Sequence, residues 1–178
     1  MLALRCRWIA LLTAATFLLA VPNANAQQPN PDMESLKGLT GVMVVVERVD
    51  PDAEREGLTT SAIQMDIEVR LRLAAIPVLT REEGLKLPTA PYLHVMVSTF
   101  TRTSGPTAST IYAYNIVIAL RQNVNSIVRP HQMISGAATW DRSELGTVGA
   151  GRLPEIRQTV KDLTDIFIND WLTANPKR

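Results

Sequence analysis

Cysteine, histidine and aromatic residues are scarce in this chain of 178 residues. The single cysteine, Cys6, excludes an intramolecular disulfide. The two histidines, His94 and His131, each stand alone, without the i,i+4 partner of a helical metal-binding pair. We therefore expect no bound metal or other cofactor, and no reaction that depends on clustered histidines.

Neither sign of charge is in excess. The chain carries 18 Lys and Arg against 17 Asp and Glu, a formal net charge of +1. A nucleic-acid-binding surface needs a clustered basic excess, so we expect no nucleic acid partner. Glu82 and Glu83 are adjacent in sequence, and Asp162, Asp165 and Asp170 are close together near the C-terminus. Catalysis by paired acids needs two carboxylates facing each other across a cleft, so we expect solvated surfaces at these positions instead.

The glycine-rich segment Gly146–Gly151 (GTVGAG) precedes a predicted helix. It lacks the Gly-Lys-Ser/Thr ending of a P-loop, and we expect it to form a turn that uses positive φ. The chain therefore carries no pattern typical of catalysis, and a hydrolytic enzyme is the least favoured function.

The N-terminal segment has the features of a secretory signal peptide. Two arginines precede an apolar run from Ile9 to Val21, and the small residues Ala24 and Ala26 follow it. The run is shorter than the roughly 20 residues that span a bilayer, which disfavours an uncleaved anchor. We predict that residues 1–26 are removed by cleavage between Ala26 and Gln27.

Cleavage changes the composition of the exported chain. The leader contains Cys6 and two of the 18 basic residues, so the remaining chain has no cysteine and a net charge of −1. Because Cys6 precedes the apolar run instead of following the cleavage site, we expect no lipid anchor. The predicted location is periplasmic or secreted, without stable membrane insertion after cleavage.

Residues 27–36 are polar and contain two prolines, which predicts a flexible tail. Residues 37–178 then form a single domain. Five segments have strand-like patterns, namely Val42–Val46, a short edge strand at Val78–Arg81, Tyr92–Phe100, Ile111–Val124, and Met133–Trp140 with a continuation toward Val148. The β-branched first segment is typical of a central strand covered by helices. Thr101–Thr110 (TRTSGPTAST) is predicted to be a hairpin loop.

Pro154–Thr173 has the clearest helical pattern. Its apolar residues recur at spacings of three and four, namely Ile156, Val160, Leu163, Phe167 and Trp171. Pro154 suits the first helical turn, and Asn175-Pro176 ends the helix.

Thr59–Ile76 is ambiguous. Met65–Leu73 alternates between apolar and polar residues, as a half-buried strand does. Acid-first i,i+4 pairs and a possible capping box at Ser61 and Gln64 favour a helix. We choose the helix over the strand. Val69 and Leu73 would then lie on a second apolar face, which is one possible interaction patch.

The element order β-α-(β)-β-β-β-α predicts an α/β (α+β) two-layer sandwich, with a mixed sheet of four or five strands and two main helices.

Candidate interaction residues are His94, Tyr112, Tyr114, Trp140 and Arg142. Trp and Arg are enriched in interface hot spots, although a Trp that caps the core edge is the alternative at Trp140. Tyr112 and Tyr114 share a strand face with Ile116 and Ile118, which also suits the core.

Two functions remain open. The first is a non-catalytic accessory module that binds another envelope protein or a second copy of itself. The second is a small-ligand-binding protein with a groove lined by His94, Tyr112 and Tyr114.

The segments EVRLR (68–72), ATW (138–140) and NDWL (169–172) resemble an uncharacterised group of small exported bacterial proteins. That resemblance implies export and this fold, and it supplies no catalytic residues.

The element order is also loosely similar to the α/β domains of envelope assembly helpers. These include the N-terminal domain of the Tol-system propeller protein, curli-secretion-type lipoproteins and penicillin-binding-protein activators. The similarity implies a function in binding partners.

Overall fold

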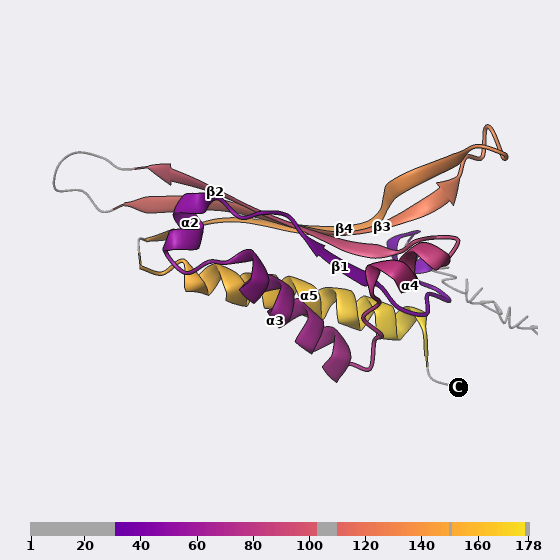
Figure 1. Ribbon diagram of the computed structural model, residues 1–178, viewed down its shortest axis with the longest axis horizontal. Coiled ribbons are helices and arrows are strands. Elements are labelled where there is room, and N and C mark those ends of the chain that lie inside the picture. Colours follow the sequence, from indigo (N-terminus) through magenta and orange to yellow (C-terminus); the bar gives the residue numbers. More distant parts are fainter. Residues whose placement is uncertain (1–30, 103–109, 150, 177–178) are drawn as a thin grey trace, which may run out of the picture.

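The computed structural model describes residues 31–102, 110–149 and 151–176. A helix layer packs against one face of a single open sheet (Figure 1). The strands are β1 (Met43–Val46), β2 (Tyr92–Arg102), β3 (Ile111–Asn125) and β4 (Met133–Gly149). The helices are α1 (Pro31–Glu34), α2 (Pro51–Arg55), α3 (Thr60–Leu73), α4 (Arg81–Lys86) and α5 (Pro154–Ala174). The predicted α+β fold with a mixed sheet is confirmed.

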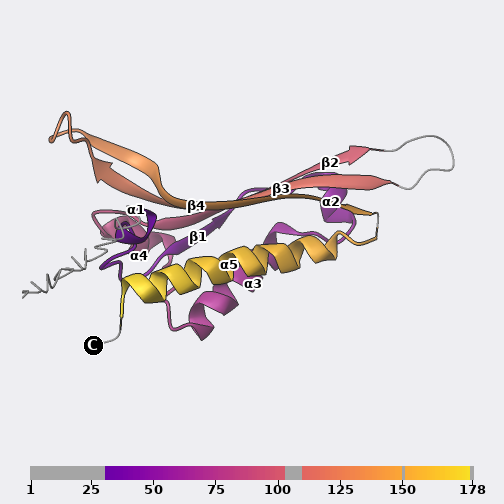
Figure 2. The ribbon, with the colours of Figure 1, turned by 180° about the vertical axis from the view of Figure 1, so that it is seen from behind.

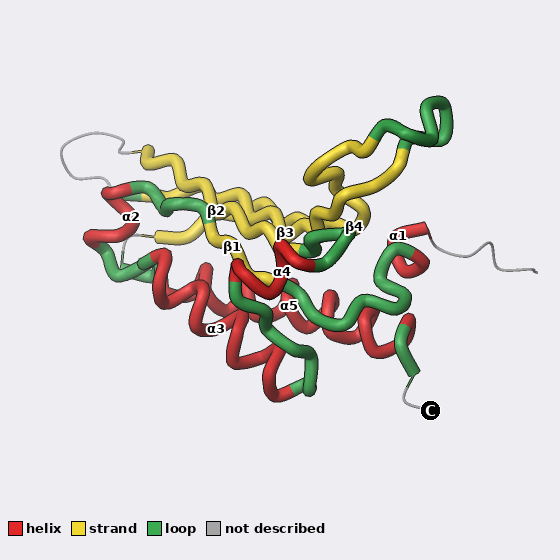
Figure 3. Tube along the Cα trace, turned by 45° about the vertical axis from the view of Figure 1, so that its right-hand side comes forward, coloured by secondary structure: helices red, strands yellow, loops and turns green. Residues whose placement is uncertain are grey.

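The four strands lie in the order β1-β2-β3-β4. β1 runs parallel to β2, and the β2-β3 and β3-β4 pairs are antiparallel. α3 and α5 lie side by side against one face, as the view from behind also shows (Figure 2). The tube view shows no long helix on the other face of the central sheet, which is called the helix-free face below (Figure 3). Of the described helices, only the short helix α4 meets this face, where Gly84 packs against the Met43 side chain of β1. Alternate residues of each strand therefore enter the core or the helix-free face.

The prediction that Val42–Val46 is a central strand is wrong, because β1 lies at the edge of the sheet. The strand predicted at Val78–Arg81 is also wrong, since only Val78 bridges Val42. Thr80 instead caps α4, whose capping box with Glu83 turns the chain into a helix at Arg81. The β-branched composition identified the strand, but it did not show how many neighbours the strand has.

α3 confirms the choice of a helix over a strand. Ile63, Ile67 and Leu71 are buried at helical spacing, whereas Val69 and Leu73 are exposed. The predicted capping box at Ser61 is wrong, because Thr59 is the N-cap and its side chain accepts the Ala62 N–H at 3.2 Å.

α5 confirms the other predicted helix, with all five of the residues that predicted it buried against the sheet. Phe167 is its central core contact. The Phe167 ring meets Trp140 of β4 edge-on at 5.0 Å between ring centroids and lies 5.8 Å from the Trp171 ring. This aromatic cluster joins the helix to the far strand of the sheet.

The predicted flexible tail at 27–36 is wrong for its described part. Residues Pro31–Glu34 form α1, and Leu36 is fully buried. The Ser35 hydroxyl donates to the Thr139 carbonyl at 3.0 Å, and the Asn175 amide donates to the Leu36 carbonyl at 2.9 Å. Proline and polar composition suggested disorder here, but one buried leucine and these bonds tie the segment to β4 and α5.

The predicted leader, its cleavage site and residues 103–109 of the predicted hairpin loop lie outside the described residues. None of the helices that the structure describes is long and apolar enough to cross a membrane.

Candidate functional site

A groove of about 950 Å³ runs beside β1 at the edge of the sheet. Its floor is β1 itself, and its walls come from α3, from the segment that leads into α4, and from the start of β2. The lining includes Val44, Val46, Glu68, Arg72, Leu85 and His94. The groove is thus bounded by side chains from parts of the chain far apart in sequence.

The outer edge of β1 points backbone hydrogen-bonding groups into this groove. Met43 and Glu47 donate their N–H groups toward the β2 side, at 3.0 and 2.8 Å. In a parallel ladder every second residue faces one neighbour, and the residues between them face the other. The N–H and C=O groups of Val44 and Val46 therefore point away from β2.

The same alternation is visible on the outer side at Val42. Its N–H donates to the Pro77 carbonyl at 3.0 Å, and its carbonyl accepts the Leu79 N–H at 2.9 Å. Within the described residues, the outward groups of Val44 and Val46 form no hydrogen bond. The outer edge of β1 is thus paired at its start and open along the rest of its length.

The edge is open because the chain turns away after Leu79. The Thr80 hydroxyl accepts the Glu83 N–H at 3.2 Å, and the Glu83 carboxylate accepts the Thr80 N–H at 2.8 Å. The hydrogen bond from the Thr80 backbone is the largest influence on the pKa of Glu83 and lowers it, so this carboxylate stays ionised in the cap. The capping box therefore ends the outer pairing of β1 after one bridge.

One wall of the groove is a row of hydrogen-bonded side chains on α3. The Gln64 amide donates to Glu68 at 2.8 Å, and Arg72 donates to the other Glu68 oxygen at 2.7 Å. Burial raises the pKa of Glu68, but these bonds and the charge of Arg72 outweigh burial and lower it. This wall is polar, ionised and already satisfied within itself.

The opposite wall carries His94, one of the predicted site residues. Its Nε2 lies 2.8 Å from Glu47 Oε1, and its ring meets the Tyr92 ring edge-on at 6.3 Å. Val45, opposite His94 in the register, is exposed on the same helix-free face. His94 is thus held in place by a carboxylate and an aromatic ring at the rim of the groove.

The predicted groove lined jointly by His94, Tyr112 and Tyr114 does not form. His94 lies opposite Ala119 on the helix-free face, whereas both tyrosines point into the core on the other face. The strand period of two separates them, so the core alternative for the tyrosines is confirmed.

The predicted exposed surface at Trp140 is wrong, because the ring is only 1% exposed. Its Nε1–H donates to Asp170 at 2.9 Å, and the Arg142 guanidinium lies 4.9 Å from the ring centroid. Arg142 also donates to Asp170 at 3.2 Å and to Asp32 at 3.1 Å. The alternative, a Trp that caps the core edge, is confirmed, and Arg142 joins β4 to α5 and α1.

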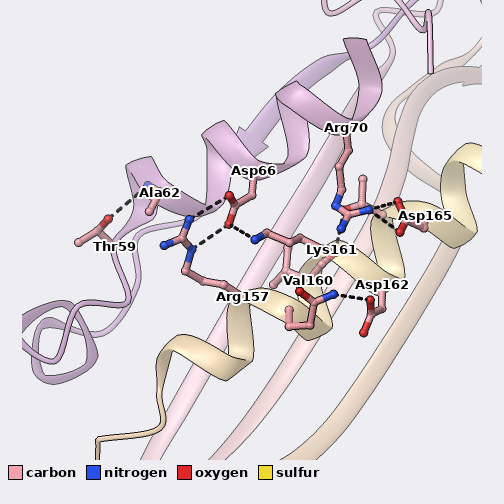
Figure 4. A network of polar contacts seen from close by, with 11 residues as sticks. Thr59, Ala62, Asp66, Arg70, Arg157, Val160, Lys161, Asp162 and Asp165 are labelled. Atoms are coloured by element: carbon pink, nitrogen blue, oxygen red, sulfur yellow. Dashed lines mark hydrogen bonds and ion pairs between the residues drawn. The ribbon is translucent and has the colours of Figure 1, made fainter. Parts of the chain in front are cut away.

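A second polar network joins α3 to α5 (Figure 4). Arg157 donates twice to Asp66, at 2.8 and 2.9 Å, and Lys161 lies 3.6 Å from the same carboxylate. Arg70 donates to Asp165 at 2.6 Å. The bond to Asp66 raises the pKa of Arg157, so the guanidinium stays charged. Asp165, expected on a solvated face, is in fact part of this contact between helices.

The glycine-rich segment is divided between a strand and a turn. Gly146 and Gly149 belong to β4, and Gly151 has a positive φ of 81°, as predicted for the turn. Gly146 is needed for another reason: a Cβ there would lie 2.4 Å from the Tyr114 hydroxyl oxygen. His131, expected in a turn, is exposed between β3 and β4.

Residues 31–102, 110–149 and 151–176 contain no group of three or more His, Cys, Asp and Glu side chains arranged to hold a metal ion.

The groove beside β1 was not predicted from the sequence. It depends on β1 pairing with β2 and on Val42 bridging Val78. Both partners are distant from β1 in sequence, and no local pattern signals such pairings.

No family model matches the chain, and no curated protein does. Among solved structures, the chain is similar to a minor lipoprotein from Acinetobacter baumannii, at 11% sequence identity and a TM-score of 0.39. The match covers 76% of this chain and 94% of that one.

Proposed function

We propose that this chain is an exported, non-catalytic accessory protein of the cell envelope that binds an extended segment of another envelope protein. The segment pairs with the outer edge of β1 as an added strand. The observation that carries the proposal is the set of outward backbone groups at Val44 and Val46, which open into a groove.

Strand addition suits this groove because an extended peptide supplies complementary N–H and C=O groups. A bound segment would continue the line that Val78 begins beside Val42. The outward backbone groups of Val44 and Val46 would then gain partners. A buried unpaired edge costs free energy, whereas an edge that opens into a groove stays hydrated until a partner covers it.

The side chains of the groove also favour a binding function over a reaction. Glu68 is held by Gln64 and Arg72, and His94 contacts Glu47. These groups are engaged with one another, so the backbone of β1 offers the hydrogen bonds that a partner would use. Leu85 and Val45 are exposed beside that backbone and would contact apolar side chains of the partner.

Export is the part of the proposal that rests on the sequence alone. The arginines, the apolar run and the Ala-Asn-Ala segment before Gln27 support it. A partner that meets this groove would then be a protein of the same compartment.

Photo-crosslinking in intact cells tests the proposal. A photoreactive side chain at Leu85, on the groove wall, is expected to yield one discrete adduct with another protein. Val44→Pro removes the outward N–H without breaking a bond to β2, since proline is tolerated where an edge N–H faces solvent. We expect Val44→Pro to reduce the adduct at least about tenfold, as the loss of one bond and a steric block would do.

Val44→Ala is the matched control, because it removes side-chain packing but keeps the N–H. It should retain the adduct. A photoreactive group at Leu172 on α5, outside the groove, should give none. Loss of the adduct in both Val44 variants, or an unchanged adduct in Val44→Pro, would contradict strand addition. An adduct with a small molecule in place of a protein would favour the ligand-binding alternative.

A further inference from the structure

The outer edge of β4 is a second uncovered strand edge, and it differs from that of β1. β4 has 17 residues and ends the sheet, with no strand of the described chain beyond it. α1 lies against its first half, where Ser35 bonds to Thr139. From Ser143 to Gly149 the edge is free of proline, lysine and bulges, the usual features that prevent edge pairing.

Leu145 is the most prominent side chain on this open edge. It is 79% exposed and lies opposite Asn115 on the helix-free face. Ile166 is exposed on α5, one helical turn before Asp170, which bonds to Arg142 of β4. Apolar side chains are thus exposed on both layers along the β4 side of the molecule.

We infer that the β4 edge binds the β4 edge of a second copy of this chain, antiparallel, with Leu145 opposite Leu145 across a two-fold axis. Identical edges related by a two-fold axis present the same surface to each other. Both sheets then join into one, and both helix layers lie on the same side with α5 next to α5.

The charges along the edge select this register. With Leu145 opposite itself, Glu144 faces Gly146 of the second copy and Ser143 faces Thr147. A shift that centred the pair on Glu144 would set two carboxylates directly opposite each other, which is destabilising. The chosen register instead pairs two exposed leucines at the distance of cross-strand neighbours.

The shape of the edge favours a second copy over a single peptide. The β1 edge is recessed in a groove bounded by α3 and the segment before α4, which suits a slender segment. The β4 edge is flanked by Leu145 on one layer and Ile166 on the other. A partner that covers both must carry a sheet and a helix layer of its own, as this chain does.

Light scattering on the exported chain tests the inference, and we expect a dimer at micromolar concentration. Leu145→Lys places two ammonium groups opposite each other and should raise the dimer dissociation constant at least about tenfold. Leu172→Lys, an equally polar change on α5 away from β4, should leave the dimer intact. A monomeric parent chain, or a Leu145→Lys variant that dimerises as well as the parent, would overturn the inference.

A cysteine experiment fixes the register. In the exported chain, from which the predicted cleavage has removed Cys6, Leu145→Cys introduces the only thiol and should form an intermolecular disulfide on mild oxidation. Val45→Cys on the opposite edge of the sheet should not. Disulfide formation only at Val45, or at neither position, would overturn the proposed pairing. Neither the light-scattering result nor the disulfide result depends on whether a segment binds in the groove beside β1.

Discussion

Phe167→Ala is expected to lower the free energy of unfolding by about 3–5 kcal/mol, because it removes the central side chain of the core. Phe167 has no exposed surface and packs between Trp140 and Trp171. Truncation removes the apolar contacts of the ring and leaves a cavity between α5 and β4. The two tryptophan rings are fixed by their own elements, so they cannot fill the space completely.

Urea unfolding monitored by tryptophan fluorescence measures this loss, because both neighbouring rings report on the same site. Leu172→Ala on the same helix is the control. Leu172 is partly exposed, so its truncation should cost much less. Equal losses for the two variants would show that α5 does not pack as described.

Asp66→Asn is expected to destabilise the protein by about 2 kcal/mol. The side chain of Asp66 is only 15% exposed and accepts two bonds from Arg157, with Lys161 beside it. The amide keeps the shape but removes the negative charge, so two cations between α3 and α5 lose their common partner. The cost stays below that of a fully buried pair because solvent still reaches Arg157 and Lys161.

Thermal and urea unfolding of Asp66→Asn should show this loss, and Glu82→Gln provides the comparison. Glu82 pairs with Lys86 on α4 at 2.6 Å, but both side chains are largely exposed. Exposed pairs of this kind contribute little, so Glu82→Gln should be nearly neutral. If the two variants behaved alike, Asp66 would not hold the two helices together.

The sequence predicted most elements of the fold because their patterns are local. The spacing from Ile156 to Trp171 predicted α5, and the alternation around Tyr112 predicted β3 with Tyr112 and Tyr114 on one face. Proline and polar residues before Leu36 led to the wrong prediction, since the segment is ordered by contacts with Thr139 and Asn175. Those contacts join residues that are far apart in sequence.

The candidate site was less accessible to prediction. His94 was identified, but its proposed neighbours lie on the opposite face, and Trp140 is a core residue bonded to Asp170. The groove arises where β1 has one full neighbour and one single bridge. A strand's neighbours are set by long-range pairing, which residue patterns within the strand do not encode.

Backbone amide exchange at Val44 and Val46 tests strand addition at β1 most directly. In the free chain both amides should exchange rapidly, while those of Met43 and Glu47, bonded on the β2 side, exchange slowly. Linear peptides selected for binding to the exported chain should then slow exchange at Val44 and Val46 at least about tenfold. Slow exchange of these two amides in the free chain, or peptide binding that protects other amides instead, would contradict strand addition at this edge.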